Sequence, residues 1–145
     1  MEALTKIQRE NLRTIAGMII PASSVYDVPG ADDEIIQADI IATLGRDTDL
    51  VRKALDQLAV FAGAPLASLS ASEREATAKT FRTQGGPTVA ALTRVVLQCY
   101  YRDDRVLRSL GLETRPPYPK GHVVENGDWS LLDIVRARPP MWRNV

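Results

Sequence analysis

Apolar residues recur at helical spacing in five stretches of this chain, and no stretch alternates apolar and polar residues as a strand does. The five stretches cover about residues 6–20, 34–44, 48–62, 71–83 and 88–101. Within each of them apolar residues return every three or four positions, which keeps one face of a helix apolar. A short helix is expected after Asp103 or Asp104, and a helical turn at about residues 130–137. The predicted fold class is therefore all-α, a compact array of about five helices.

The ends of the predicted helices carry their own signals. Thr5-Lys6-Ile7-Gln8 and Ser70-Ala71-Ser72-Glu73 both fit a capping box, in which the first and last residues bond each other's backbone N–H groups. Gly45 and Gly63 suit the position just after a helix. Gly85-Gly86 predicts a tight turn between two helices, for which an anion site at the following helix start is the weaker alternative.

The apolar residues predict which face of the first two helices is buried, and they predict a central position for the fifth helix. On the first helix the face is predicted to be Ile7, Leu12, Ile15, Met18 and Ile19, and on the second it is Ile35, Ile36, Ile40, Ile41 and Leu44. The stretch 88–101 is the most apolar, which predicts a helix in the middle of the core.

Beyond residues 1–111, the helical part, the pattern changes. Residues 112–145 are predicted to form an extended C-terminal arm of the same domain, which contains both tryptophans and is rich in proline and aromatic residues. A disordered tail would be poor in aromatic residues and high in net charge. We therefore expect the arm to lie on a surface, and we expect a partner interface there, because Trp, Tyr and Arg dominate interface hot spots. The predicted interface residues are Tyr118, His122, Trp129, Arg136, Arg138 and Trp142.

Composition narrows the function classes. The chain has 145 residues and 18 residues of each charge sign, so it lacks the basic excess that nucleic-acid binders usually show. Cys99 is the single cysteine, which excludes an intrachain disulfide and favours an inert core thiol. No apolar run approaches the ~20 residues that span a bilayer, and no signal peptide is recognised. The expected location is the cytoplasm, or the periplasm if a leader was removed or a partner exports the complex.

Few residues suggest chemistry. Asp32, Asp33 and Glu34 could bind a metal, but acidic residues at a helix start are better explained by the helix dipole. His122 could form an acid–base set with Asp128 and Tyr118, yet no nucleophile motif accompanies it. We therefore predict no catalytic, cofactor-binding or metal-ligating residue in this chain.

Three segments resemble the gluconate 2-dehydrogenase subunit 3 family. Leu12–Pro21 (LRTIAGMIIP) followed by Val28–Asp32 (VPGAD) is similar to the family's opening, an amphipathic helix that ends in Ile-Ile-Pro and a loop that leads to Pro-Gly-Ala. Tyr100–Gly111 (YYRDDRVLRSLG) resembles a later segment, and Pro116–Gly121 (PPYPKG) resembles the proline-rich tail. Together the segments span most of the chain.

The resemblance implies a non-catalytic small subunit that stabilises or escorts a large flavoprotein. In that family the large subunit is a dehydrogenase of the glucose–methanol–choline type that holds FAD and a sugar or polyol substrate. The twin-arginine leader of many members is not matched, since Arg9 and Arg13 are not adjacent. Two alternatives stay open: a stand-alone enzyme with its site near His122, and a self-associating helical scaffold.

Overall fold

The computed structural model describes residues 4–115, 121 and 125–139. The chain divides into two compact units, residues 1–114 and 115–145, and each unit is described by itself. The first contains six α-helices and two short 3-10 helices: α1 (Lys6–Ile19), α2 (Glu34–Thr43), η1 (Gly45–Asp47), α3 (Thr48–Ala62), η2 (Leu66–Ser68), α4 (Ala71–Gln84), α5 (Gly86–Tyr100) and α6 (Asp104–Ser109). The second contains η3 (Trp129–Leu132), which leads directly into α7 (Asp133–Arg136).

The all-α prediction is confirmed for the part of the chain that the structure describes. That part contains no strand, only an isolated antiparallel bridge between Ser23 and Val28. It has seven α-helices where about five were predicted. The five longest, α1 to α5, correspond to the five periodic stretches, and the two others, six and four residues long, lie where a short helix and a helical turn were expected.

Both predicted capping boxes are present. The Thr5 N–H donates to Gln8 Oε1 at 2.9 Å, and the Ser70 N–H donates to Glu73 Oε2 at 2.8 Å. Each cap residue in turn accepts a bond from the N–H three residues on. These exchanges satisfy backbone donors that the first turn of a helix otherwise leaves unpaired, and so they fix where α1 and α4 begin.

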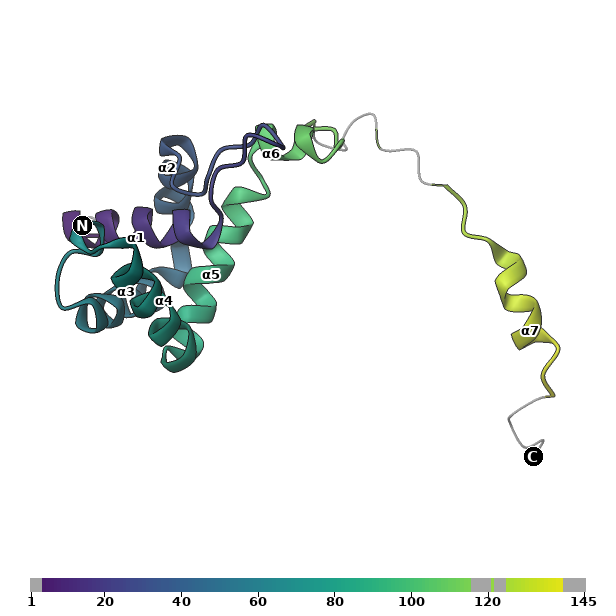
Figure 1. Cartoon of the computed structure of the whole chain (residues 1–145). Coiled ribbons are helices and arrows are strands. Elements are labelled where there is room, and N and C mark those ends of the chain that lie inside the picture. The colour runs from purple at the N-terminus through teal and green to yellow at the C-terminus, as the bar shows by residue number, and fades with distance from the viewer. Residues whose placement is uncertain (1–3, 116–120, 122–124, 140–145) are drawn as a thin grey trace. The chain divides into compact units, whose positions relative to one another are not determined.

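The core of the first unit is built around α3 and α5. Helix α3 packs against α1, α4 and α5, and α2 packs against α5 (Figure 1). The buried face of α5 includes Leu92, Val95, Val96 and Cys99, as expected for the most apolar stretch of the sequence. Burial raises the pKa of the Cys99 thiol, which keeps it protonated at neutral pH.

Three residues assigned to the buried faces of the first two helices are exposed instead. Ile7 of α1 is 58% exposed, Met18 is 37% exposed and Ile35 of α2 is 64% exposed. At about 100° per residue, Ile7 and Met18 lie about 140° and 120° around α1 from the buried Leu12. The prediction was wrong because it accepted apolar residues whose spacing does not place them on a single helical face.

Two buried amide side chains in this core each have a hydrogen-bond partner. Asn11 of α1 accepts a hydrogen bond from the Leu66 N–H at 3.0 Å, which ties α1 to η2. Gln37 of α2 donates to the Ala31 carbonyl at 2.7 Å. A buried amide group costs little when it is bonded in this way, so both residues hold connections in place at small expense to stability.

Candidate partner-binding surfaces

Three of the six predicted interface residues of the arm lie in the described part of the chain. Trp129, Arg136 and Arg138 are described and all three are exposed. Tyr118, His122 and Trp142 lie outside the described residues, so their grouping with the other three stays a prediction. The acid–base set of His122, Asp128 and Tyr118 is untested for the same reason.

The segment Trp129–Arg136 is ordered by its own local bonds. Asp128 caps it, accepting from the Ser130 N–H at 3.0 Å and from the Ser130 hydroxyl at 2.6 Å. These bonds hold the pKa of Asp128 below its usual value, so the carboxylate is ionised at neutral pH. At the other end Arg136 pairs with Asp133 at 3.3 Å, although both side chains are well exposed and such a pair stabilises little.

Five of the seven residues from 129 to 135 are large and apolar, and all five are exposed. Trp129 is 67% exposed and Ile134 is 74% exposed, and the others are Leu131, Leu132 and Val135. An isolated exposed apolar residue needs no explanation, but a contiguous group is typical of a binding surface. We refer to these five side chains as the arm patch. Of these five residues, Trp129 alone was among the interface residues predicted from the sequence, although the run of apolar residues was a signal for the other four.

A second exposed apolar group, a pair of side chains, lies on the turn formed by residues 21–30. Val25 is 84% exposed and Tyr26 is 71% exposed. The base of this turn is closed by two backbone bonds of 3.1 Å between Ser23 and Val28. Asp27 at the tip adopts a left-handed conformation with φ of +50°, which is uncommon for a residue other than glycine.

The turn is anchored to the helices behind it. The Tyr100 hydroxyl of α5 donates to the Pro29 carbonyl at 3.2 Å, and the Ala31 N–H donates to the Ile20 carbonyl at 2.9 Å. Gly30 allows this close approach, since a Cβ atom there would lie 2.9 Å from the Ala22 nitrogen. The turn therefore presents Val25 and Tyr26 from a fixed base, which sequence reasoning did not foresee.

One guanidinium joins the starts of two helices next to this turn. Arg105 of α6 bonds Asp33, the N-cap of α2, at 2.8 and 3.2 Å. It also bonds Asp103, the N-cap of α6, at 2.8 and 3.0 Å. The bonded guanidinium is the main cause that lowers the pKa of both carboxyl groups, and the two carboxylates raise the pKa of Arg105. We call these three residues the Arg105 clamp.

The clamp gives Asp33 a structural role. Besides Arg105, Asp33 accepts from the N–H groups of Ile35 and Ile36 at the start of α2. The prediction that acidic residues at this position serve the helix start is confirmed for Asp33. Among the described residues, no group of three or more His, Cys, Asp or Glu side chains is arranged to hold a metal ion.

A shallow hollow of about 760 Å³ lies between the 21–30 turn and α6. The cations on its wall are Arg105, held in the clamp, and Arg108, which pairs with Asp104 at 3.1 Å. Because both are already matched by aspartates, the hollow has little attraction for an anionic ligand.

No described helix combines the length and apolar character that crossing a membrane requires. Comparisons of this chain with protein-family models, with curated proteins and with solved structures found no match.

Proposed function

We propose that this chain is a non-catalytic small subunit that stabilises or escorts a larger FAD-dependent dehydrogenase. The partner would be a flavoprotein of the glucose–methanol–choline type that oxidises a sugar or polyol. FAD and the substrate would be bound by that partner, and the present chain would contribute binding surface only.

The arm patch is the observation that supports this proposal most. Burying one side chain of this size stabilises a complex by roughly 1.5–3 kcal/mol before the costs of association are subtracted. Five such side chains within seven residues form a compact anchor, and arginines at 136 and 138 follow it on the C-terminal side. A hydrophobic centre with polar and arginine residues around it is the usual composition of a protein interface.

The positions of the family-like segments also support the proposal. Val28–Asp32 and Tyr100–Gly111 are far apart in the sequence, yet the Tyr100–Pro29 bond joins them, and Arg105 in the second segment bonds Asp33, the residue after the first. Two of the segments that carry the resemblance are thus held together in the folded first unit, as a shared constraint on the fold would produce.

A subunit of this kind needs no catalytic residue of its own. Any protein that binds the folded form of a partner and not its unfolded form raises the partner's stability by mass action. The stabilisation amounts to about 2.7 kcal/mol when the subunit is present at about 100 times its Kd. An anchor that ties the two chains together also lets one chain accompany the other through the cell.

Association with the flavoprotein tests the proposal. The chain is co-expressed with a large flavoprotein subunit from its own host, and the Kd of the purified pair is measured by calorimetry. We expect Trp129→Ala and Leu132→Asp each to weaken binding by about 2 kcal/mol, or roughly 30-fold, because they remove parts of a buried anchor.

Val60→Asp is the matched control. Val60 is an exposed apolar residue on α3, outside the arm, and its replacement should leave the Kd within about twofold. Binding at full strength by both arm variants would refute the role of the arm patch. Substrate turnover by the chain alone, or a stable homo-oligomer without a second polypeptide, would favour one of the alternatives.

A further inference from the structure

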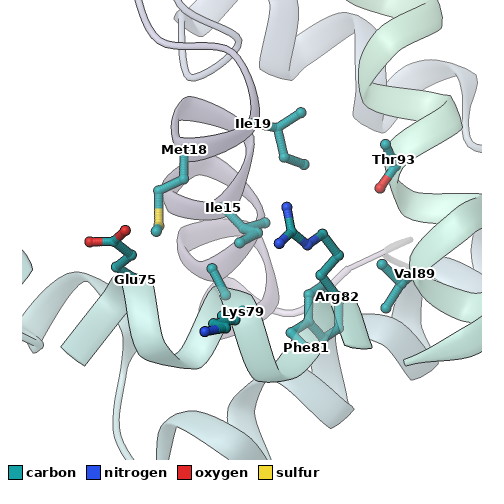
Figure 2. Close-up of a pocket in the computed structure, with 10 residues that line it drawn as sticks. Ile15, Met18, Ile19, Glu75, Lys79, Phe81, Arg82, Val89 and Thr93 are labelled. Atoms are coloured by element: carbon teal, nitrogen blue, oxygen red, sulfur yellow. The ribbon is translucent and has the colours of Figure 1, made fainter. Parts of the chain in front are cut away.

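An apolar groove separates α1 from α4 and α5 in the first unit. Its volume is about 480 Å³, and Figure 2 shows its lining. The apolar residues are Ile15, Met18 and Ile19 of α1, Ala78 and Phe81 of α4, and Val89 of α5. Glu75, Lys79 and Arg82 of α4 and Thr93 of α5 complete it.

The groove is open because of the residues on its two walls. Ile15 and Phe81 are each only 3% exposed and form its floor, whereas Met18 stands at its edge and is 37% exposed. Ala78 places a single methyl group at the middle of α4, where a larger residue would fill the gap between the helices. Methionine at such an edge adapts its shape to different occupants, because its unbranched side chain is flexible.

Two cations on one side of α4 border this apolar floor. Lys79 and Arg82 are three residues apart, so they project from neighbouring positions on the helix. Figure 2 shows the Arg82 side chain reaching from α4 toward Ile15 and Ile19. Within the described part of the chain neither residue forms an ion pair, although Arg94, Arg102, Arg105 and Arg108 each pair with an aspartate.

The combination of an apolar floor and two unmatched cations selects the chemistry of an occupant. A neutral lipid or a neutral apolar helix would leave both cations without a partner. A segment with carboxylates beside its apolar residues would match both features, because opposite charges at the edge of an interface fix orientation and speed association. Glu75, at the other end of the lining, disfavours acidic residues there and so sets the direction of the occupant.

We infer that this groove binds an amphipathic α-helix of a partner protein, with large apolar residues on one face and Asp or Glu beside them near Lys79 and Arg82. Residues 75–82 of α4 span about 10 Å at 1.5 Å per residue, so about two turns of the bound helix would fill the groove. Apolar residues at positions i, i+3 or i+4 and i+7 would enter it, as in other helix-in-groove complexes. The groove uses no residue of the arm, so this inference does not depend on the proposed function.

Binding of a designed peptide to the full chain tests the inference. The probe is a capped helical peptide of about 16 residues with a leucine stripe at helical spacing and glutamates beside it. Its match carries lysines in place of the glutamates. We expect the glutamate peptide to bind at least about tenfold more tightly than the lysine peptide in a fluorescence anisotropy titration.

Charge reversal on the protein should invert this preference. The double variant K79E/R82E is expected to bind the glutamate peptide at least about tenfold more weakly and the lysine peptide more tightly. The double variant R46E/K53E makes the same change of net charge on exposed residues outside the groove, and should change neither Kd by more than about twofold. Met18→Asp places a carboxylate at the apolar edge and should weaken binding of the glutamate peptide as well.

Three outcomes would overturn the inference. The two peptides could bind wild-type chain equally, or K79E/R82E could leave the preference unchanged, and in either case the cations do not select the occupant. Sedimentation of the chain alone could instead reveal a dimer that K79E/R82E abolishes, which would make a second copy of this chain the occupant. Circular dichroism of each variant confirms that a loss of binding is not a loss of fold.

Discussion

Arg105→Gln tests how much the Arg105 clamp stabilises the first unit. The substitution keeps a polar side chain of moderate length but removes the positive charge and the two-pronged bonds to Asp33 and Asp103. Both carboxylates stay in place as helix caps. What the variant loses is therefore the guanidinium and its attraction to two acids.

The expected loss is about 2 kcal/mol of unfolding free energy at neutral pH. An exposed ion pair contributes about 0–1 kcal/mol, whereas removing one partner of a buried pair costs about 3–5 kcal/mol. The clamp lies between these limits, because the Arg105 side chain is 37% exposed but that of Asp103 is only 9% exposed. Two well-formed ion pairs, each weakened by solvent screening, therefore give an expected loss between these two limits.

The effect should depend on pH in a direction that the carboxyl groups determine. The folded protein holds the pKa values of Asp33 and Asp103 below the usual 3.8, so their contribution to stability is complete above that pH. It is lost as the pH falls through the lowered values, because the carboxyl groups then take up protons and no longer attract the guanidinium. The difference in unfolding free energy between wild type and variant should therefore become smaller in acid.

Urea unfolding followed by circular dichroism at pH 7, and again near pH 2.5, measures both quantities. Arg108→Gln is the control, since the Arg108–Asp104 pair is well exposed on both sides and should contribute less than about 0.5 kcal/mol. An Arg105→Gln effect no larger than that of the control would refute the reasoning. So would a gap between wild type and variant that stays the same size in acid.

Two further substitutions test the fold. Gly30→Ala should destabilise by about 1–3 kcal/mol in the same assay, because its Cβ would press on the Ala22 nitrogen, whereas Gly127→Ala, with nothing within 4 Å, should have almost no effect. Asn11→Ala should cost about 1–3 kcal/mol, because it leaves the buried Leu66 N–H without an acceptor; an unfolding midpoint equal to wild type would show that this bond contributes nothing.

Local signals in the sequence were sufficient to place most helices. The capping boxes at Thr5 and Ser70 and the glycines after α2 and α3 are read within four residues of the boundary they mark. The rules that connect such residues to helix ends depend on backbone geometry alone, so they hold without knowledge of the rest of the fold.

Features that join distant residues could not be predicted in this way. Arg105 and Asp33 are 72 positions apart, and Asn11 and Leu66 are 55 positions apart. Which of several arginines meets which aspartate depends on how the helices pack, and the sequence contains no local sign of it. The groove was missed for a related reason: its lining comes from three helices, and Met18 was assigned to a buried face.

The arm could be predicted from the sequence only in part. Its apolar run and the helical turn near residue 130 could be read from the sequence, and the structure has η3 and α7 there. The grouping of Tyr118, His122 and Trp142 with Trp129 depends on backbone that the structure does not describe. The six residues proposed for the interface therefore remain a hypothesis about a bound state.

The closed base of the 21–30 turn makes its tip a convenient place for a reporter. Since the bonds between Ser23 and Val28 hold the chain on either side, a fluorophore attached at Val25 would perturb the helices little while it senses anything that approaches the turn. Cys99 is buried, so a cysteine introduced at position 25 could be labelled selectively in the folded protein. Such a conjugate would distinguish a partner that covers this side of the first unit from one that touches only the arm.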